Sequence, residues 1–346
     1  MSQIQSSKFI EAAETMAAWR RPLLFSHAKP DGDALGSLIA MHRFLASPGV
    51  EPMIVLFDDV PGRYAFLERL APCRRLGKDI QWDGLADADA VILLDTCSYS
   101  QLEPVADWLR SSSLTKLVVD HHATGDDLAD VLLADASAAS TSLLLFEWAR
   151  SVGWSLDTGT AVALYVGLAT DTGWFRHSNT DARALEAAAD LTRQGARAHE
   201  LFDALYQQES VARFRLRAEA CKRLELRFGE RLAVITIPTS VFGESGAVRA
   251  DTEDLVNEPL RLASVVVSIM LVEDAGGIIR VGFRSRAPSD PQATTCAKIP
   301  DVDVAAIAQS FGGGGHRRAA GARVTGTLEQ VKERIVVRIE PTLTDP

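Results

Sequence analysis

The chain lacks long hydrophobic runs and has little cysteine. No apolar stretch approaches the ~18 residues that a membrane-spanning helix needs. The first residues, MSQIQSSKFIEAAETMAAWRR, are polar and amphipathic and do not resemble a secretory signal. The 346 residues include four scattered cysteines without a CxxC pair: Cys73, Cys97, Cys221 and Cys296. We therefore expect reduced thiols in a cytoplasmic protein, with no disulfide framework, no zinc site and no membrane partner.

Basic residues are also scarce relative to acidic ones. Lys and Arg total 36 and Asp and Glu total 46, which gives a net charge of −10. Proteins that grip long nucleic acids by their phosphates are usually basic, so this balance argues against an extended duplex partner. A short anionic substrate remains compatible, because bound metal ions and a few arginines can supply local positive charge.

The order of apolar and amphipathic segments indicates an α/β protein of about two domains, taking ~150 residues per domain. In the first half, helical patterns alternate with apolar runs of strand length, which predicts a parallel sheet covered by helices. The expected strands are 22–26, 53–57, 90–95 and 116–120, and the expected helices include 34–45, 101–110, 140–150 and 159–168.

The second half predicts a smaller α/β domain with a mixed sheet. Residues 181–227 are charged and helix-forming. Beyond them, Gly276–Gly277 is a hairpin signal between two apolar runs. The expected strands are 232–237, 264–272 and 278–284, and the expected helices are 251–262, 302–309 and 328–338. We predict domains at 1–190 and 228–346, joined by a helical linker at 191–227.

Seven acid and imidazole side chains in the first half follow these apolar runs, in SHAKPDGDALGS, LLDTCS, VVDHHAT and ATDTGWF. They are His27, Asp31, Asp33, Asp95, Asp120, His121 and Asp171. Open α/β sheets bind ligands beyond the carboxyl ends of their strands. Carboxylates mixed with imidazole suit a pair of divalent ions such as Mn²⁺, and two such ions imply phosphoester hydrolysis.

Each of these acids has a simpler interpretation when taken alone. The Asp31-Gly32-Asp33 triplet is typical of a turn with an N-capping aspartate. Asp95 and Asp171 could equally cap a helix or a turn, and Asp120 could support a ligating imidazole from behind. Arg176 and Asn179 could contact a phosphate or a base, or lie on the surface. It is the recurrence at several strand ends that favours a metal site.

The glycine run FGGGGHRRAAG (311–321) is the second signal. Four glycines suit neither a helix interior nor an ordinary strand, and their N–H groups can form a nest for an anionic oxygen. The alternative is a flexible linker. We expect phosphate binding by Gly313, Gly314, Gly315 and His316, helped by Arg284, Ser285 and Arg286 in VGFRSR. Arg317 and Arg318 could simply be solvated.

Taken in order, HAKPDGDALGS, LLDTCS, VVDHHAT, ATDTGWF and GGGGHRRAAG resemble the DHH phosphoesterase superfamily with its DHH-associated C-terminal domain. The resemblance covers nearly the whole chain, and its length and layout are most similar to the nano-RNase branch. It implies two divalent ions, Mn²⁺ or Mg²⁺, one held by His27, Asp31 and Asp95 and the other by Asp33, Asp95, His121 and Asp171. Asp95 would bridge them.

The same resemblance implies the remaining roles. His122 would sit near the scissile phosphate and Asp120 would orient an imidazole, so that His122, Asp120 and Asp95 form the catalytic set. Arg284, Ser285, the glycine run and His316 would bind the substrate. Gly32, a departure from the family pattern, is expected to loosen its loop.

The expected activity is hydrolysis of oligoribonucleotides of two to five residues to mononucleotides, and of 3′-phosphoadenosine 5′-phosphate to AMP. The alternatives are a phosphodiesterase of cyclic or linear dinucleotides such as pApA, an inorganic pyrophosphatase, and a non-catalytic nucleotide-binding regulator. A homodimer is the default assembly.

Overall fold

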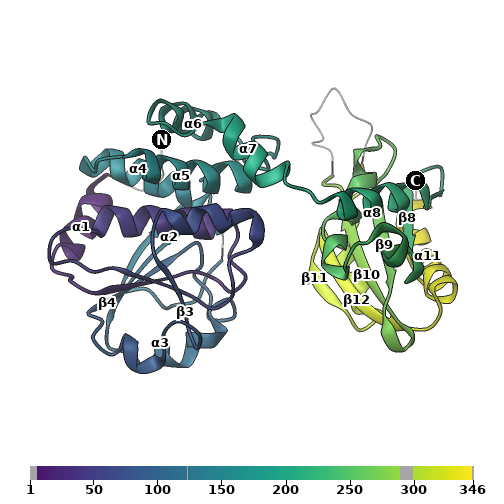
Figure 1. Ribbon diagram of the computed structural model, residues 1–346, viewed down its shortest axis with the longest axis horizontal. Coiled ribbons are helices and arrows are strands. Elements are labelled where there is room, and N and C mark those ends of the chain that lie inside the picture. Colours follow the sequence, from purple (N-terminus) through teal and green to yellow (C-terminus); the bar gives the residue numbers. More distant parts are fainter. Residues whose placement is uncertain (1–5, 123, 289–298, 345–346) are drawn as a thin grey trace. The chain divides into compact units, whose positions relative to one another are not determined.

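The computed structural model describes residues 6–122, 124–288 and 299–344. The chain divides into two compact units, Met1–Gln208 and Glu209–Pro346. Each unit has its own six-stranded sheet and its own hydrophobic core (Figure 1). Of the region predicted as a linker, helix α7 (Ala198–Tyr206) belongs to the first unit and helix α8 (Val211–Lys222) to the second.

The N-terminal unit is built on a parallel sheet, as the sequence predicts. Its strand order is β3-β2-β1-β4-β5-β6, and every neighbouring pair is parallel. The central strands are buried along their whole length, which is typical of a sheet covered on both faces. The strands are β1 (Pro22–Phe25), β2 (Met53–Leu56), β3 (Cys73–Arg75), β4 (Ala90–Leu94), β5 (Thr115–Asp120) and β6 (Val131–Ala134).

Helices cover both faces of this sheet. Figure 1 shows α2, α4 and α5 side by side on one face and α3 on the other. Nine of the fourteen residues of α5 are buried, because it packs against both α2 and α4. The helices of this unit are α1 (Ser6–Met16), α2 (Gly32–Leu45), α3 (Ala106–Ser111), α4 (Thr141–Val152), α5 (Thr158–Asp171), α6 (Ala182–Arg193) and α7.

Gly32 does not loosen its segment as expected. It is the buried first residue of α2, and a Cβ atom there would lie 2.2 Å from Oγ1 of Thr170 on α5. The glycine therefore lets the start of α2 press against the end of α5, which brings two of the predicted metal-binding segments together.

The C-terminal unit has the mixed sheet that the sequence predicts, in the order β11-β12-β10-β9-β8-β7. The pair β8–β9 is parallel and the other pairs are antiparallel. Gly276 and Gly277, both with φ near +70°, join β9 to β10, which confirms the hairpin signal. The strands are β7 (Leu224–Arg227), β8 (Leu232–Ile237), β9 (Val267–Glu273), β10 (Ile278–Ser285), β11 (Gly314–His316) and β12 (Ala319–Thr325).

Helix α11 (Leu328–Thr344) packs on one face of this sheet through Val331, Ile335 and Ile339, and α10 (Val304–Gln309) belongs to the same core. Helices α8 and α9 (Ser240–Ser245) pack instead against side chains such as Ile235, Met270 and Val272. These belong to a second core, separate from the one under α11.

Three local predictions in this unit are wrong. The predicted helix 251–262 is a pair of 3-10 segments, η4 (Arg249–Thr252) and η5 (Leu255–Arg261), separated by Asp254 with φ +65°. The end of the predicted helical stretch is strand β7, which pairs with β8. Part of the glycine run is strand β11, because its backbone pairs with β12.

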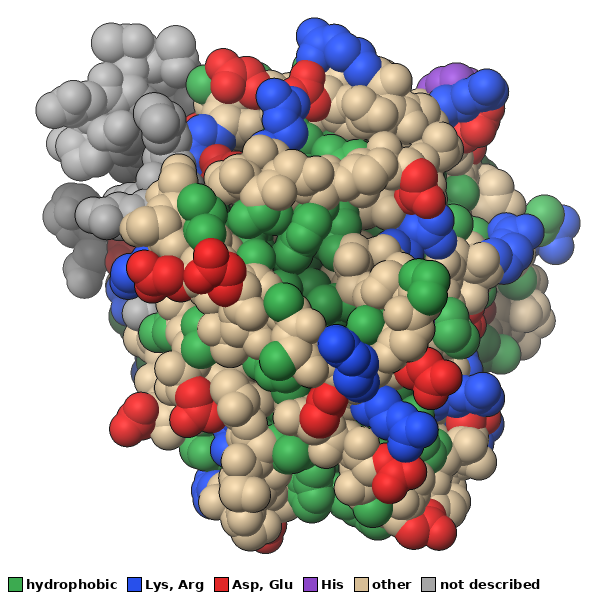
Figure 2. Space-filling model, turned by 90° about the vertical axis from the view of Figure 1, so that its left-hand side faces the viewer, with side chains coloured by type: hydrophobic (Ala, Val, Ile, Leu, Met, Phe, Trp, Pro, Cys, Tyr) green, Lys and Arg blue, Asp and Glu red, His purple; other side chains and the backbone are tan. Residues whose placement is uncertain are grey.

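None of the described helices is long and apolar enough to cross a bilayer. On the face of the molecule that Figure 2 shows, basic and acidic side chains are interspersed, with hydrophobic ones gathered in a hollow between them. This face therefore presents no continuous basic surface for a long nucleic acid.

Candidate metal centre

The six predicted metal ligands come together in the N-terminal unit. His27, Asp95 and His121 follow the carboxyl ends of β1, β4 and β5, while the remaining three lie at the start of α2 and the end of α5. Ligand atoms lie within 4.8 Å of one another in three groups: His27, Asp31 and Asp95; Asp33, His121 and Asp171; and Asp95, His121 and His122.

Asp95 is the centre of this arrangement. One carboxylate oxygen, Oδ2, lies 3.5 Å from Nε2 of His27, and the other, Oδ1, lies 3.5 Å from Nε2 of His121. The side chain is buried, and the Thr141 hydroxyl donates to Oδ1 at 3.0 Å. Its backbone has φ +62°, a conformation that costs energy in a non-glycine residue and is often found at functional sites. Each oxygen of Asp95 thus faces a different imidazole, as a bridging carboxylate would.

Both imidazoles are held from behind by backbone carbonyls. Nδ1 of His27 donates to the Ala28 carbonyl at 2.8 Å, and Nδ1 of His121 donates to the Ala138 carbonyl at 3.3 Å. In the neutral ring, this leaves a lone pair on each Nε2, pointing at carboxylate oxygens. A lone pair facing an anion calls for a cation between them, and the carbonyl contact behind the ring is the usual support of a metal-bound histidine. The residues therefore fit a metal centre.

Asp33 is fixed by the start of α4. Its two carboxylate oxygens accept the backbone N–H groups of Thr141 at 2.7 Å and Ser142 at 2.9 Å, so the positive end of the helix stabilises the negative charge. The sequence gives no signal for this contact, because Thr141 lies 108 residues beyond Asp33. Serine and threonine at a predicted helix start indicate an N-cap. Nothing in that pattern indicates a contact between the start of α4 and the segment that contains Asp33.

Asp31 combines the two interpretations that the sequence left open. It is the N-cap of α2, and its Oδ1 accepts from the N–H groups of Asp33 and Ala34. The same oxygen lies 3.9 Å from Nε2 of His27. Capping thus aims the carboxylate into the cluster and leaves Oδ2 without a capping contact.

The clustering of carboxylates perturbs their protonation. Burial raises the pKa of Asp95 well above its usual range, and the neighbouring Asp33 and Asp31 raise it further. Burial, followed by the same two neighbours, raises the pKa of Asp171 to about 8. Removing these charges from water is unfavourable unless cations compensate them, so the ionised cluster is a binding site for positive charge.

Asp120 and His122 form a separate pair beside the cluster. Nδ1 of His122 lies 2.7 Å from Oδ1 of the fully buried Asp120, and this hydrogen bond is the main cause that raises the pKa of His122 to about 9. The His122 side chain is 45% exposed, so its outer edge is open to a ligand. The other oxygen of Asp120 is buried without a partner among the described residues. The imidazole that Asp120 orients is thus His122.

Of the two further polar residues near Asp171, Asn179 contacts this predicted ligand directly, because its side-chain amide donates to Oδ2 of Asp171 at 3.4 Å, whereas Arg176 contacts the backbone. The side-chain amide of Asn179 donates to the Ala139 carbonyl at 3.0 Å, and Arg176 donates to the Gly173 carbonyl at 2.7 Å. These contacts shape the turn that follows α5.

In the C-terminal unit, Arg284, Gly312 and Gly313 line an open cavity of about 740 Å³. The hydroxyl of Ser285 points inward, where it donates to the Val302 carbonyl at 2.8 Å. Gly314 is part of β11, Gly315 has φ +142°, and His316 is exposed at the end of that strand.

Three arginines named in the sequence analysis, Arg286, Arg317 and Arg318, are occupied within the unit. Arg286 donates to three backbone carbonyls, those of Leu260, Leu262 and Ala263, which ties down the end of β10. Arg317 and Arg318 both pair with Asp301, so they are not simply solvated.

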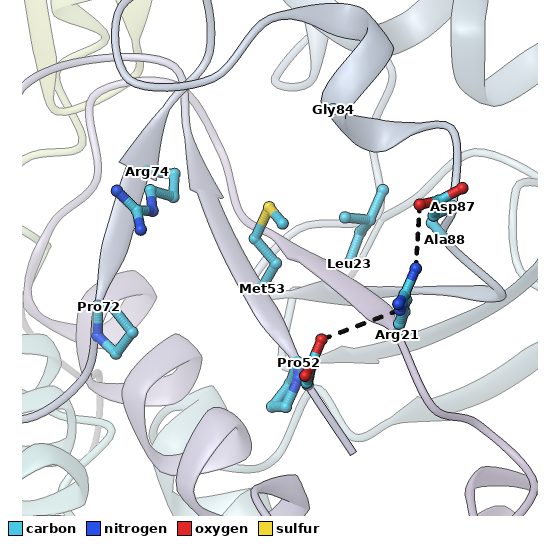
Figure 3. A pocket seen from close by; sticks show the side chains of 10 residues that line it. Arg21, Leu23, Pro52, Met53, Pro72, Arg74, Gly84, Asp87 and Ala88 are labelled. Atoms are coloured by element: carbon cyan, nitrogen blue, oxygen red, sulfur yellow. Dashed lines mark hydrogen bonds and ion pairs between the residues drawn. The ribbon is translucent and has the colours of Figure 1, made fainter. Parts of the chain in front are cut away.

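A second cavity, of about 290 Å³, lies at the opposite ends of the strands in the N-terminal unit. Its lining includes Leu23 and Met53, at the amino ends of β1 and β2 (Figure 3). There Arg21 forms ion pairs with Asp87 and Glu51. It contains none of the predicted site residues, and its charged groups compensate each other.

Comparison with known proteins agrees with this geometry. Residues 22–168 match the model of the DHH family, N-terminal domain. The chain is 29% identical over 336 residues to the bifunctional oligoribonuclease and PAP phosphatase NrnA of Thermus thermophilus, covering 96% of this chain and 93% of that protein. It is 25% identical to the protein of the same name from Bacillus subtilis, covering 95% and 97%.

The fold is shared with a crystal structure of an exopolyphosphatase-related protein from Bacteroides fragilis, with a TM-score of 0.84 over the whole of both chains and 23% identity. The matched family domain contains His27, Asp31, Asp33, Asp95, Asp120, His121 and His122 and ends three residues before Asp171. Residues 22–168 are thus identified as a DHH family N-terminal domain, and nearly the whole chain is similar in sequence to these bifunctional relatives.

Proposed function

We propose that this protein hydrolyses short oligoribonucleotides to mononucleotides and removes the 3′-phosphate of 3′-phosphoadenosine 5′-phosphate, acting in the cytoplasm with two divalent ions. The observation that carries the proposal is the position of Asp95, with each carboxylate oxygen 3.5 Å from a different, carbonyl-supported imidazole. The names of the two relatives, each similar over more than nine-tenths of both chains, support the substrate class.

The ligand types favour Mn²⁺ over Mg²⁺. Four carboxylates and two imidazoles surround the centre, and imidazole is a better ligand for Mn²⁺ than for Mg²⁺, which prefers oxygen and water. We assign His27, Asp31 and Asp95 to one ion and Asp33, Asp95, His121 and Asp171 to the other. When bound, two such ions supply a nucleophilic water at neutral pH and polarise the phosphoryl oxygens.

The chain's own residues set the geometry of the reaction. Asp33 is held by the start of α4 and Asp95 by Thr141, so both carboxylates stay in place before any substrate binds. Such preorganised groups need no rearrangement during the reaction. Much of an enzyme's electrostatic stabilisation of the transition state comes from this preorganisation.

His122 is the residue that we assign to the substrate. Because its Nδ1 is bound to Asp120, its Nε2 can hold a proton on the open edge of the ring. A protonated imidazole is no metal ligand, but it can donate to a non-bridging phosphoryl oxygen and stabilise its charge. Asp120 keeps the ring in place and compensates its charge.

The C-terminal unit is proposed to bind the rest of the substrate. Arg284 lines its cavity together with the glycine run, and a guanidinium can bind a phosphate with two parallel hydrogen bonds. The limited extent of this cavity favours short substrates. We also retain the homodimer as a prediction from the sequence.

The test is an assay of the purified protein with Mn²⁺ on four substrates: pApA, RNA of two to five residues, 3′-phosphoadenosine 5′-phosphate and pyrophosphate. We expect release of mononucleotides from pApA and short RNA, and release of phosphate from the third compound. Asp95→Ala should abolish turnover, while the matched variant Asp87→Ala, in the second cavity, should not. Turnover of pyrophosphate alone, or nucleotide binding without any cleavage, would contradict the proposal.

A further inference from the structure

The cavity of the C-terminal unit extends along the sheet beyond Arg284. Its lining includes two more arginines, Arg280 on β10 and Arg323 on β12. Strands β10 and β12 lie side by side (Figure 1). Their register places Arg280 opposite Arg323, with Arg284 four residues further along β10. At about 3.4 Å per residue, Arg280 lies ~14 Å along the strand from Arg284.

All three arginines stand on the same face of the sheet. Their neighbours Ile279, Val281 and Phe283 point to the other face, into the core that α11 covers. Between the arginines, Gly282 pairs with Gly321, which in turn pairs with Gly314. A bare backbone floor therefore separates Arg284 from the Arg280–Arg323 pair.

The packing of the protein does not require glycine at these three positions. None of them has a positive φ, and a Cβ atom would meet nothing closer than 3.5 Å at Gly282 or Gly321 and nothing within 4 Å at Gly314. Glycine inside a strand weakens a sheet, and it often marks a place where a ligand approaches closely. The open space above the floor is the cavity itself.

The charge distribution points to an anion. Arg280 and Arg323 are exposed, and neither has an ion pair or hydrogen-bond partner within residues 6–122, 124–288 and 299–344. Like charges directly opposite each other on a sheet are unfavourable. Of the other charged lining residues, Arg249 pairs with Asp274, while Glu253 and Asp254 lie on the η4–η5 side. The described residues therefore supply no counter-charge to Arg280 and Arg323.

A buried polar atom on the same side adds a second indication. On β9, Met270 and Val272 line the cavity, and Ser268 alternates with them on that face, opposite Arg284. Its hydroxyl is completely buried and has no hydrogen-bond partner among the described residues. Buried hydroxyl groups are normally satisfied, so this one indicates a missing partner on the Arg284 side of the floor.

We propose that the Arg280–Arg323 pair is an accessory phosphate site that binds the RNA chain beyond its terminal nucleotide, across the glycine floor. This inference rests on the proposed function and makes it more specific. Pairs of guanidinium groups bind phosphodiesters well, while the bare floor and the apolar Met270 and Val272 accept a sugar or base of any sequence. Because this pair lies ~14 Å along the strand from Arg284, only an RNA with several phosphates occupies both positions, so the site favours the longer substrates.

The experiment compares Arg280→Ala/Arg323→Ala with Arg334→Ala/Arg338→Ala in the full-length protein. The control removes the same charge from α11, on the opposite face of the sheet. We expect the first variant to lose about tenfold or more in kcat/KM on a pentaribonucleotide, through KM, because each guanidinium–phosphate contact is a charge-assisted hydrogen bond. Turnover of pApA should stay within about twofold of wild type, and the melting temperature should not fall.

A binding measurement separates this inference from the proposed function. A labelled pentaribonucleotide is titrated in the presence of a chelator, so that no cleavage occurs, at several salt concentrations. The slope of log K against log[salt] should become shallower by about 0.7 for each lost phosphate contact, and Lys at both positions should restore part of it. Equal slopes and affinities in the variant and the control would overturn the accessory site. If the variant and the control differ in slope and affinity but the wild type cleaves no RNA, only the proposed activity would be overturned.

Discussion

Replacing Asp171 by Asn should stabilise the metal-free protein while impairing the loaded enzyme. Asp171 is the last residue of α5, and burial beside Asp33 and Asp31 raises its pKa from 3.8 to about 8. Because the pKa is raised in the folded state, the contribution of Asp171 to the free energy of unfolding is greatest below pH 3.8. This contribution is lost as the pH rises towards 8. At neutral pH, the metal-free protein therefore carries a penalty that a neutral amide of the same shape would remove.

The size of the effect follows from the same shift. The penalty grows by about 1.4 kcal/mol for each pH unit above the usual pKa, which gives about 4 kcal/mol at neutral pH. Because the side chain is 29% exposed, we expect solvent screening to reduce the gain to about 2 kcal/mol. For a unit of this size, that corresponds to a rise of about 4–8 °C in the melting temperature.

The assay is thermal unfolding with a chelator and with Mn²⁺, together with turnover of pApA. Asp171→Asn should raise the melting temperature only in the chelator and should lower Mn²⁺ affinity and turnover. Asp157→Asn is the matched control at the other end of α5. Its pKa is lowered by a hydrogen bond from Arg43, so losing this charge should lower stability in both conditions. If Asp171→Asn failed to stabilise the metal-free protein, the buried carboxylate of Asp171 would not destabilise the fold as we expect.

The remaining predictions concern the same site. The melting temperature of the metal-free wild type should fall between pH 5 and pH 8, because the raised pKa values of Asp171 and His122 both favour the folded state at low pH. Mn²⁺ should therefore raise the melting temperature more at pH 8 than at pH 5. An equal rise at both pH values would contradict this. Asp120→Asn should lower kcat and move the alkaline limb of the pH–rate profile below pH 9, because His122 loses its negative partner; an unshifted limb would show that Asp120 does not set the His122 pKa. Gly32→Ala should cost about 1–3 kcal/mol of stability in urea unfolding and reduce turnover, since its Cβ would overlap the Thr170 side chain; full activity would mean that α2 and α5 can separate freely.

Local pattern was sufficient for the parallel sheet and for the position of the site. The apolar runs before His27, Asp95 and His121 are buried strands, and parallel strands deliver their carboxyl ends to one edge. That geometry accounts for the meeting of His27, Asp95 and His121, whereas the assignment of six ligands to two ions comes from the resemblance to the DHH superfamily and stays a prediction. What the pattern could not give is the support behind each ligand, because the contacts of Asp33 with α4 and of His121 with Ala138 join segments far apart in the sequence.

The glycine run shows the opposite case. Composition alone favoured an irregular nest, yet the Gly314–His316 backbone pairs with β12, because antiparallel pairing satisfies its N–H and C=O groups. Strand β7 was likewise missed, since Leu224–Arg227 has a helix-compatible composition and becomes a strand only through its pairing with β8. Tertiary pairing decided both segments.

The proposed function depends on Asp95 joining two metal ions in one centre. The most direct measurement is Mn²⁺ binding to the metal-free protein by calorimetry, with electron paramagnetic resonance of the loaded sample. We expect two ions per chain with a spin-coupled signal in wild type, and loss of the coupling together with at least one ion in Asp95→Asn. A single ion per chain in wild type, or two coupled ions in Asp95→Asn, would contradict it.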